Sequence, residues 1–356
     1  RQMTYTAVNE ILEDKDPVTR KEYDFLVPMF EDMAELHHIL ETMRQKRGAI
    51  SFEDREAKIL VDEKGHPEEI VLRERGLGEK MIESFMLAAN ETVAYEYESK
   101  HLPFIYRIHE APKEEKLTRF FDFASLFGLK IHGTKKNISP KDLQDIIKSV
   151  KDKPEAPVIS TMLLRSMQQA KYSEDNLGHY GLGAEYYTHF TSPIRRYPDL
   201  MVHRLIHYYA HPNEEKTAQY ALNLPDIAQQ ASTMERKAVD AERMVDSMKK
   251  AEFLQDHVGE VFPGVISSVT KFGLFVELEN TIEGLVHISN LPEDYFHFIE
   301  GKMSLVGERT GAVYRLGQKV SVKVIKADPV LREIDFELVR TSKDNENKVG
   351  HSQRKG

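Results

Sequence analysis

The spacing of apolar residues changes abruptly near Gly259, and this change constrains the fold more than any other feature of the chain. Before it, apolar residues recur mainly every three or four positions, which is typical of helices with one buried face. After it, five short runs alternate apolar and polar residues within about eighty positions, and glycines separate them. Such alternation is typical of short strands that close into a small barrel. The sequence therefore predicts an α+β chain: a mixed helical and sheet region followed by a five-stranded β-barrel of the OB type.

A single long helix is predicted immediately before this change, over about residues 225–257. Its apolar positions alternate spacings of four and three: Ile227, Ala231, Met234, Ala238, Ala241, Val245 and Met248. Alanines at alternate positions let another element approach closely, so we expect this stripe to be packed. Further upstream, two strands joined by a Lys64-Gly65 turn precede a helix predicted from Glu79 to His101.

Composition places the chain among ordinary globular proteins. Of its 356 residues, 40% are apolar and 30% are charged, and no apolar run is long enough to cross a membrane. There are no cysteines, which excludes a disulfide framework and thiolate catalysis and fits a cytoplasmic location. A net charge of −9 argues against attraction to nucleic acid over the whole surface, but it leaves room for a local basic groove.

The domain organisation follows from the same patterns. The chain starts with Arg1 and continues directly in a helical pattern, which we interpret as the interior of a longer protein. We expect residues 1–257 to form one domain and residues 258–340 to form the barrel domain. Residues 341–356 are polar and poor in apolar side chains, so we expect a disordered tail.

The predicted barrel carries aromatic side chains that suit unpaired bases. Phe272 and Phe275 flank a glycine in "KFGLF", and His287 follows in "EGLVHIS". Phenylalanine on an alternating strand usually belongs to the core. Here Leu274 and Val276 take the inward positions, so we expect Phe275 to point outward, where a base can stack on it.

Three segments of this region, "GVISSVTKFGLFVEL", "IEGLVHISNL" and "YRLGQKVSVKVIKAD", resemble the RNA-binding OB domain of the ribosomal protein S1 type. The resemblance implies that Phe272, Phe275 and His287 stack on bases. It also places Asp328 and Arg332 at the polar positions of the last loop and strand. The ligand that it implies is single-stranded RNA.

The segment "HFTSPIRRYPDLMVHR" brings two arginines to a predicted helix start. Ser192 followed by proline is typical of a first turn, which would put Arg195 and Arg196 beside the positive end of the helix dipole. A bound phosphate would offset that penalty, because guanidinium groups and free backbone N–H groups both bind phosphate oxygens. The alternative is an internal ion pair in which Asp199 or Asp246 neutralises the arginines.

Glu83 and Phe52 are further candidates, each with two interpretations. Glu83 lies in "MIESFMLAAN", a largely apolar part of a predicted helix, and a buried carboxylate there needs a cation or hydrogen-bond donors. It either pairs with Lys80 or an arginine, or it faces a polar substrate channel. Phe52 follows Ile50 in the strand-like "RGAISFE", where phenylalanine is usually core.

Together these segments resemble the ribonuclease II/ribonuclease R (RNB) family of processive 3′→5′ exoribonucleases. Five segments occur in the family's order: "RGAISFE", "IESFMLAANETVA", "YRIHEAPKEEKL", "GHYGLGAEYYTHFTSPIRRYPDLMVHRLIHYY" and "AERMVDSMKKAEFL". The resemblance extends over about residues 3–338. It implies hydrolysis of single-stranded RNA from the 3′ end to nucleoside 5′-monophosphates.

The same resemblance implies roles for individual residues. Arg195 matches the catalytic arginine that stabilises charge on the scissile phosphate, and Ser192 and Arg196 hold the RNA backbone nearby. The remaining implied roles are base stacking by Phe52, a catalytic, channel-lining carboxylate at Glu83 and a contact of Glu242 with the terminal nucleotide.

The family uses a divalent metal, usually Mg²⁺, held by a cluster of aspartates, and no such cluster occurs in this sequence. We therefore expect the chain to be the C-terminal part of such an enzyme, inactive alone but able to bind single-stranded RNA. The alternative is a non-catalytic RNA-binding protein or an inactive paralogue. Beyond single-stranded RNA, structured RNA and the ribosome are candidate partners, and we expect a monomer with no membrane association.

Overall fold

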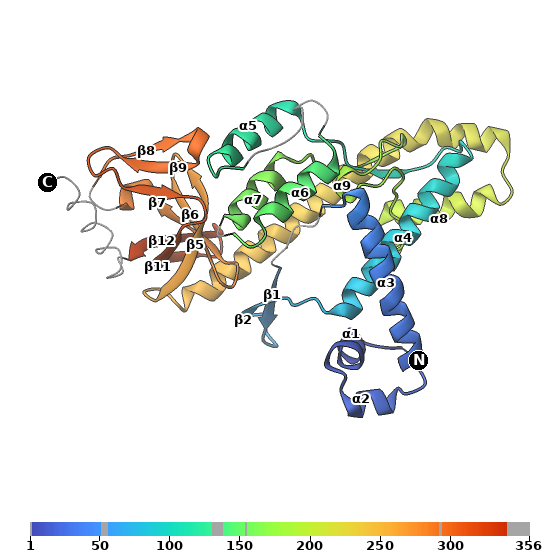
Figure 1. Ribbon diagram of the computed structural model, residues 1–356, viewed down its shortest axis with the longest axis horizontal. Coiled ribbons are helices and arrows are strands. Elements are labelled where there is room, and N and C mark those ends of the chain that lie inside the picture. Colours follow the sequence, from blue (N-terminus) through green and yellow to red (C-terminus); the bar gives the residue numbers. More distant parts are fainter. Residues whose placement is uncertain (1, 51–55, 130–137, 154, 292–293, 340–356) are drawn as a thin grey trace.

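The computed structural model describes residues 2–50, 56–129, 138–153, 155–291 and 294–339 of an elongated molecule (Figure 1). A barrel lies at one end of the long axis, and helix α8 (Tyr197–Tyr209) lies towards the other end. Helix α9 (Glu214–Gln255) runs between the two ends. The predicted mixed helical and sheet architecture followed by a barrel is confirmed.

Helices dominate the part of the chain before the barrel. The first four helical elements are α1 (Tyr5–Asn9), the π-helical turn η1 (Glu10–Asp14), α2 (Pro17–Glu22) and α3 (Val27–Arg47). They are followed by α4 (Leu77–Ser99), α5 (Glu114–Ser125), α6 (Pro140–Val150), α7 (Ala156–Ser166) and the short 3₁₀ turn η2 (Tyr180–Leu182). No helix in the described ranges has the length and apolar character needed to span a bilayer.

Two small antiparallel pairs interrupt the helices. β1 (Ala57–Val61) pairs with β2 (Pro67–Leu72), as the Lys64-Gly65 turn predicts. β3 (Tyr106–Ile108) pairs with β4 (Lys171–Ser173), which lies far along the sequence. This second pair matters for the site, because it brings the segments on either side of α5–α7 together.

The barrel is closed by five strands in the order β11-β12-β7-β6-β5, so the five-stranded prediction is confirmed. These strands are β5 (Val261–Thr270), β6 (Gly273–Leu278), β7 (Glu283–His287), β11 (Lys319–Asp328) and β12 (Glu333–Val339). The β12–β7 pair is parallel, and the β11–β12, β11–β5, β5–β6 and β6–β7 pairs are antiparallel. A separate sheet of β8 (Phe296–Ile299), β9 (Ser304–Gly307) and β10 (Val313–Arg315) is inserted between β7 and β11.

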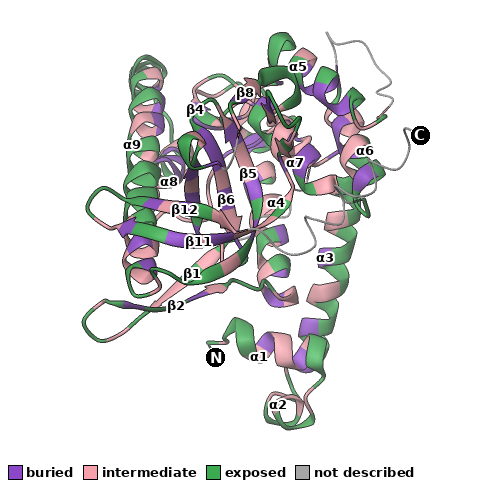
Figure 2. Cartoon of the chain, turned by 90° about the vertical axis from the view of Figure 1, so that its left-hand side faces the viewer, coloured by how far each residue is buried: buried purple, intermediate pink, exposed green. Residues whose placement is uncertain are grey.

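Apolar side chains are buried in several clusters, and α9 takes part in two of them. Inward residues of the barrel strands form one cluster, and Figure 2 shows buried residues along β5 and β6. Ala251 and Leu254 of α9 are 0% exposed within this cluster. Near its other end, α9 buries Leu224 and Ala228 against α4, α8 and β3. One helix therefore connects the barrel to the helical region.

Helix α9 differs from its prediction in two respects. It begins at Glu214 and runs through Pro225, which was expected near its start. Its apolar stripe is partly buried at Ile227, Ala231 and Met248, but Met234, Ala238, Ala241 and Val245 are exposed. Every residue from 236 to 247 is exposed. The expectation that the whole stripe is packed is therefore wrong for the middle of the helix.

Candidate functional site

The arginine turn, residues 192–196, precedes helix α8 instead of forming its first turn. It is closed by Ser192 O, which accepts from Arg195 N at 3.3 Å and from Arg196 N at 3.0 Å. Helix α8 begins only at Tyr197, with Pro198 in its first turn. The helix start predicted at Ser192 is therefore wrong, because the second proline of the segment is the one that lies at the helix N-terminus.

A buried carboxylate holds the arginine turn in place. Asp199 is 0% exposed, and its Oδ1 accepts from Ser192 N at 2.8 Å and from Arg196 Nη2 at 2.9 Å. The ion-pair alternative is therefore right for Arg196, with Asp199 as its partner, whereas Asp246 is exposed on α9. This arrangement fixes the backbone of the turn and the direction of one guanidinium together.

Arg195 is in a different situation from its neighbour. Its side chain is exposed, and within the described ranges its guanidinium has no hydrogen bond or ion pair. Ile194 and Tyr197 beside it are 101% and 52% exposed, so the turn stands out from the surface. An unpaired guanidinium in this position can bind a phosphate group with two parallel hydrogen bonds.

Beneath the arginine turn lies a row of aromatic side chains that sequence reasoning missed. Consecutive ring centroids are 5.0–5.8 Å apart, and the rings meet edge to face. The members of this histidine row are His109, His179, Tyr187, His189 and Tyr172. His179, Tyr187 and His189 lie within eleven positions of one another in the sequence. This clustering could have indicated part of the row. His109 could not be found in this way, because it joins the row only through the fold.

Burial and nearby cations keep the histidines of this row neutral. Burial lowers the pKa of His189 to about 2, and the guanidiniums of Arg196, Arg107 and Arg195 add to the effect. The pKa of His179 is lowered to about 3, again mainly by burial, with smaller effects of His109 and Arg107. The same guanidiniums that disfavour an imidazolium favour an anion at this place.

Helix α9 contributes to the site through Glu235. This carboxylate pairs with Arg107 Nη1 at 2.6 Å, and the Arg107 guanidinium lies 4.7 Å from the centre of the Tyr172 ring. Glu242 follows Glu235 by seven residues, so it lies on the same face of α9, roughly 10 Å further along the axis. It is exposed. The Glu242 side chain is therefore accessible to RNA, as its predicted contact requires.

Helix α4 contributes through Asn90, whose Oδ1 accepts from Phe190 N at 3.0 Å and whose Nδ2 donates to Tyr187 Oη at 3.1 Å. Glu83 precedes Asn90 by seven residues, so it lies on the same face about two turns away. Its side chain is 49% exposed and pairs with Arg75. Glu83 is therefore not buried, and the interpretation that it pairs with an arginine is right. Phe52 lies outside the described residues.

The barrel presents aromatic side chains on its outer face. Leu274 and Val276 are 0% exposed in the core, whereas Phe275 is only partly buried, so the predicted alternation is confirmed. Phe272 is 59% exposed, and Lys271 Nζ lies 5.0 Å from the centre of its ring. His287 is exposed opposite Gly273, the residue next to Phe272. These side chains offer stacking platforms beside a cation.

Asp328 ends β11 and Arg332 lies in the turn before β12, away from Phe272 and His287. Asp328 Oδ1 accepts from Val330 N at 3.0 Å and from the next backbone N–H at 2.9 Å, so it shapes the turn. Because β12 runs parallel to β7 with Asp335 opposite Leu285, this turn lies near the start of β7. His287 ends β7, so roughly 16 Å of strand separates it from Arg332.

Several buried polar atoms around the arginine turn have no hydrogen-bond partner among the described residues: Thr191 Oγ1, Arg196 Nε and Asp199 Oδ2. An unpaired buried polar atom costs about 1–3 kcal/mol. These atoms can therefore form hydrogen bonds with water or with a polar ligand at the arginine turn.

These residues do not fit the Mg²⁺ site that the family resemblance implies. Mg²⁺ takes six oxygen ligands in octahedral geometry, with carboxylates and water prominent among them. Near the arginine turn, Asp199 already pairs with Arg196, and Glu235 pairs with Arg107. Within the described ranges, the group of three close metal-ligating side chains lies elsewhere, on α3, and two of its members are histidines.

Comparisons with known proteins match both parts of the chain. The RNB domain model matches residues 1–212, and the S1 RNA binding domain model matches residues 255–338. The chain is 54% identical over 358 residues to ribonuclease R 1 of Lactococcus lactis, covering 99% of this chain and 43% of that protein. It is 40% identical over 362 residues to ribonuclease R of Escherichia coli, covering 99% and 44%. The chain thus spans less than half the length of these relatives.

A solved structure shows the same likeness in three dimensions. It is the Mycoplasma genitalium RNase R in complex with ribose methylated single-stranded RNA, with a TM-score of 0.87 and 30% identity. The match covers 94% of this chain and 53% of that one. Because the RNB model covers more than half of the sequence and these relatives match nearly all of it, the chain belongs to the RNB family of ribonucleases.

Proposed function

We propose that this chain binds single-stranded RNA and supplies the phosphate-binding part of a 3′→5′ exoribonuclease active site of the ribonuclease R kind. The observation that carries the proposal is the exposed, unpaired guanidinium of Arg195 beside the fixed pair of Arg196 and Asp199. The ribonuclease R names of the relatives and the RNA in the Mycoplasma genitalium complex support the ligand class.

In this proposal each part of the site has a defined task. Asp199 holds the arginine turn and Arg196, so that Ser192 and Arg196 position the RNA backbone. Arg195 binds a non-bridging oxygen of the scissile phosphate and stabilises the charge that builds up there during hydrolysis. Glu83 and Glu242, which lie on the faces of α4 and α9 that border the site, contact the 3′-terminal nucleotides.

The barrel supplies the second RNA contact. Phe272, Phe275 and His287 stack on successive bases, and Arg332 binds the backbone at the other end of the same outer surface. We assign residues 1–257 to the catalytic domain, 258–340 to the RNA-binding barrel and 341–356 to a disordered tail. Hydrolysis in this proposal requires Mg²⁺, whose ligands lie outside the described residues.

RNA binding by the 356-residue chain is the first test. Fluorescence anisotropy with a labelled single-stranded RNA should show binding that weakens steeply as the salt concentration rises, because phosphate contacts release counterions. A DNA duplex of equal length should bind more weakly, since its bases are not free to stack. Absence of RNA binding at low salt would refute the proposal.

RNA hydrolysis is the second test, made with Mg²⁺ on 3′-labelled and 5′-labelled RNA. The 356-residue chain alone should leave the RNA intact. A protein in which this chain is extended to the full length of its Lactococcus lactis relative should shorten RNA from the 3′ end. RNA shortening by the 356-residue chain alone would contradict the proposal that this chain holds only the phosphate-binding part of the active site.

A non-catalytic RNA-binding protein is the second candidate, favoured by the pairing of both carboxylates near the arginine turn with arginines. It predicts that even the extended protein binds RNA without shortening it, so the same assay distinguishes the two functions.

We further propose a monomer that acts in the cytoplasm, with structured RNA and the ribosome as larger partners. The cysteine-free composition supports the compartment. Light scattering should give the mass of one chain, 41.1 kDa. A mass of two chains would contradict the monomer.

A further inference from the structure

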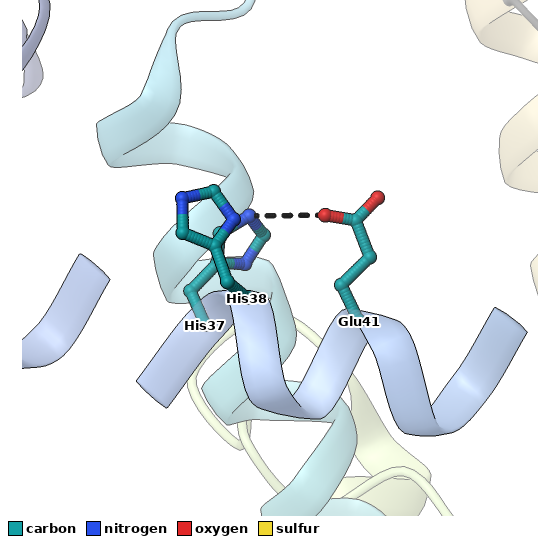
Figure 3. Close-up of side chains that lie close together, drawn as sticks. All are labelled: His37, His38 and Glu41. Carbon is teal, nitrogen blue, oxygen red and sulfur yellow. Dashed lines mark ion pairs between the residues drawn. The ribbon is translucent and has the colours of Figure 1, made fainter. Parts of the chain in front are cut away.

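Helix α3 carries a group of potential metal ligands that the functions assigned above do not use. His37, His38 and Glu41 present one ligand atom each, and these atoms all lie within 4.8 Å of one another (Figure 3). His37 Nε2 is 3.4 Å from Glu41 Oε2, close to the separation of two ligands around a tetrahedral ion. We propose that His37, His38 and Glu41 form a binding site for Zn²⁺ or a similar late transition-metal ion.

The hydrogen bonds of Ser84 favour the form of His37 that binds a metal. Ser84 Oγ donates to Lys80 O at 3.1 Å and accepts from Arg44 Nη2 at 3.0 Å. With its one proton placed in this way, Ser84 Oγ accepts from His37 Nδ1, which is 2.6 Å away. His37 then carries its proton on Nδ1, and its Nε2 presents a lone pair.

This lone pair faces a second acceptor. The His37 side chain is 4% exposed, and its Nε2 points towards the carboxylate of Glu41 (Figure 3). Two acceptors at 3.4 Å repel each other unless a positive charge lies between them. A histidine that donates one ring N–H to a neighbouring group and ligates through the other nitrogen is the usual arrangement at zinc sites.

The other two ligands, Glu41 and His38, are oriented or exposed in a way that suits metal binding. Gln45 Nε2 donates to Glu41 Oε1 at 3.2 Å, which leaves Oε2 directed towards His37. His38 is exposed and lines a groove of about 660 Å³ on the side of α3, so an ion can reach the site from solvent.

The donor set decides which metal the site takes. Two imidazoles and one carboxylate suit Zn²⁺, Ni²⁺ or Cu²⁺, whereas Mg²⁺ prefers an all-oxygen shell. A water molecule would complete four-fold coordination. The charge of Arg44 beside Ser84 opposes a cation, so we expect micromolar and not tighter affinity for Zn²⁺. Bound metal would join α3 to α4 through His37 and Ser84.

The test is a calorimetric titration of the chelator-treated 356-residue chain with ZnCl₂. One Zn²⁺ per chain should bind with micromolar affinity, and excess MgCl₂ should not compete. His38→Asn and Glu41→Gln should each weaken this affinity at least tenfold, because each removes one ligand. Both side chains are on the surface side of α3, so the variants should unfold at the same temperature as the parent chain without metal.

His211→Asn is the matched control, because His211 is an exposed histidine after α8. It should bind Zn²⁺ like the parent chain. Should His38→Asn fold poorly, Glu41→Gln still decides the question. Absence of zinc binding, or equal affinity of the control and both site variants, would overturn the proposal. Neither result depends on RNA binding or hydrolysis.

Discussion

Two adjacent arginines, Arg195 and Arg196, differ because a buried carboxylate reaches only one of them. Asp199 neutralises Arg196, which is 21% exposed, and ties it to the backbone of the turn. Arg195 is exposed, and no described group neutralises it. In our proposal the two arginines have different tasks: Arg196 holds the turn, and Arg195 binds a phosphate.

The first prediction concerns Arg195→Ala in the protein extended to the length of its relatives. Hydrolysis of single-stranded RNA should fall by about 10²–10³, the usual loss when one donor to a developing charge is removed. RNA affinity should change less than about tenfold, because one phosphate contact among many is lost. Single-turnover hydrolysis and anisotropy titrations measure the two quantities separately.

Arg119→Ala is the matched control for this prediction. Arg119 is an arginine of α5 whose side chain is 79% exposed, so both quantities should stay unchanged. Arg195→Lys should recover part of the rate, since it keeps the charge but loses the bidentate geometry. Equal losses of affinity and rate in Arg195→Ala would show that Arg195 anchors RNA without acting on the transition state.

The second prediction concerns pH. His179 and His189 have pKa values of about 3 and about 2 in the folded chain, below the ordinary histidine value of about 6.5. At pH values between the folded and the ordinary pKa, the unfolded chain binds more protons than the folded chain. The free energy of unfolding therefore falls as the pH falls. Each group contributes at most about 1.4 kcal/mol per pH unit, and less because both rings are partly exposed. Urea unfolding at about pH 7.5 and about pH 5.5 measures the slope.

His189→Gln should make this slope shallower, because one of the histidines whose pKa is lowered in the folded chain is gone. His211→Gln should leave it unchanged, since that histidine is exposed. The prediction fails if the parent chain is as stable at the lower pH as at the higher one.

The helices and strands differ in how well the sequence alone predicts their positions. The alternation around Phe275 predicted both the barrel strands and the outward position of this ring, because a strand's side-chain period is fixed at two. The start of α8 was not predictable in the same way. Both Pro193 and Pro198 suit a first helical turn, and the choice depends on Asp199, whose carboxylate binds Ser192 N across the turn. A hydrogen bond between residues seven positions apart distinguishes two similar local signals.

The barrel's outer surface is longer than the sequence suggested. The resemblance placed Phe272, His287, Asp328 and Arg332 in one RNA-binding set. The strand register separates the aromatic pair from the β11–β12 turn. The surface therefore has an aromatic end at Phe272 and His287 and a charged end at Arg332. The two ends should contribute to RNA affinity in different ways.

The third prediction follows from this division. Phe272→Ala should weaken RNA binding by about 1–3 kcal/mol, roughly five- to 150-fold, while the salt dependence of binding stays the same. Arg332→Ala should lower the salt dependence, because a phosphate contact is lost. Anisotropy titrations at several salt concentrations measure both. Phe25→Ala is the control, since Phe25 is also a surface aromatic, 66% exposed. Affinity unchanged in Phe272→Ala would contradict stacking at this site.

Across the chain, α9 connects the barrel to the helical region, yet the middle of α9 packs against neither. Ala231 and Ala238 occupy equivalent positions of one stripe, but only Ala231 is partly buried. Periodicity predicts that a face is apolar, and it cannot say what covers that face. The partners of a helix face belong to the tertiary structure, which is why the packing prediction was right near Ala231 and wrong near Ala238.

The last prediction concerns the stability of α9 along its length. Residues 236–247 are exposed on every side, so tertiary packing does not stabilise this stretch, whereas most helical stability in proteins comes from such packing. Its amides should exchange with deuterium at least about tenfold faster than those of residues 248–255, where Ala251 and Leu254 are buried against the barrel. Mass-spectrometric hydrogen exchange on the 356-residue chain resolves the two stretches, with peptides of β6 as the slow reference. Equal protection of both stretches would show that another surface covers the middle of α9 in solution, and the prediction would then be wrong.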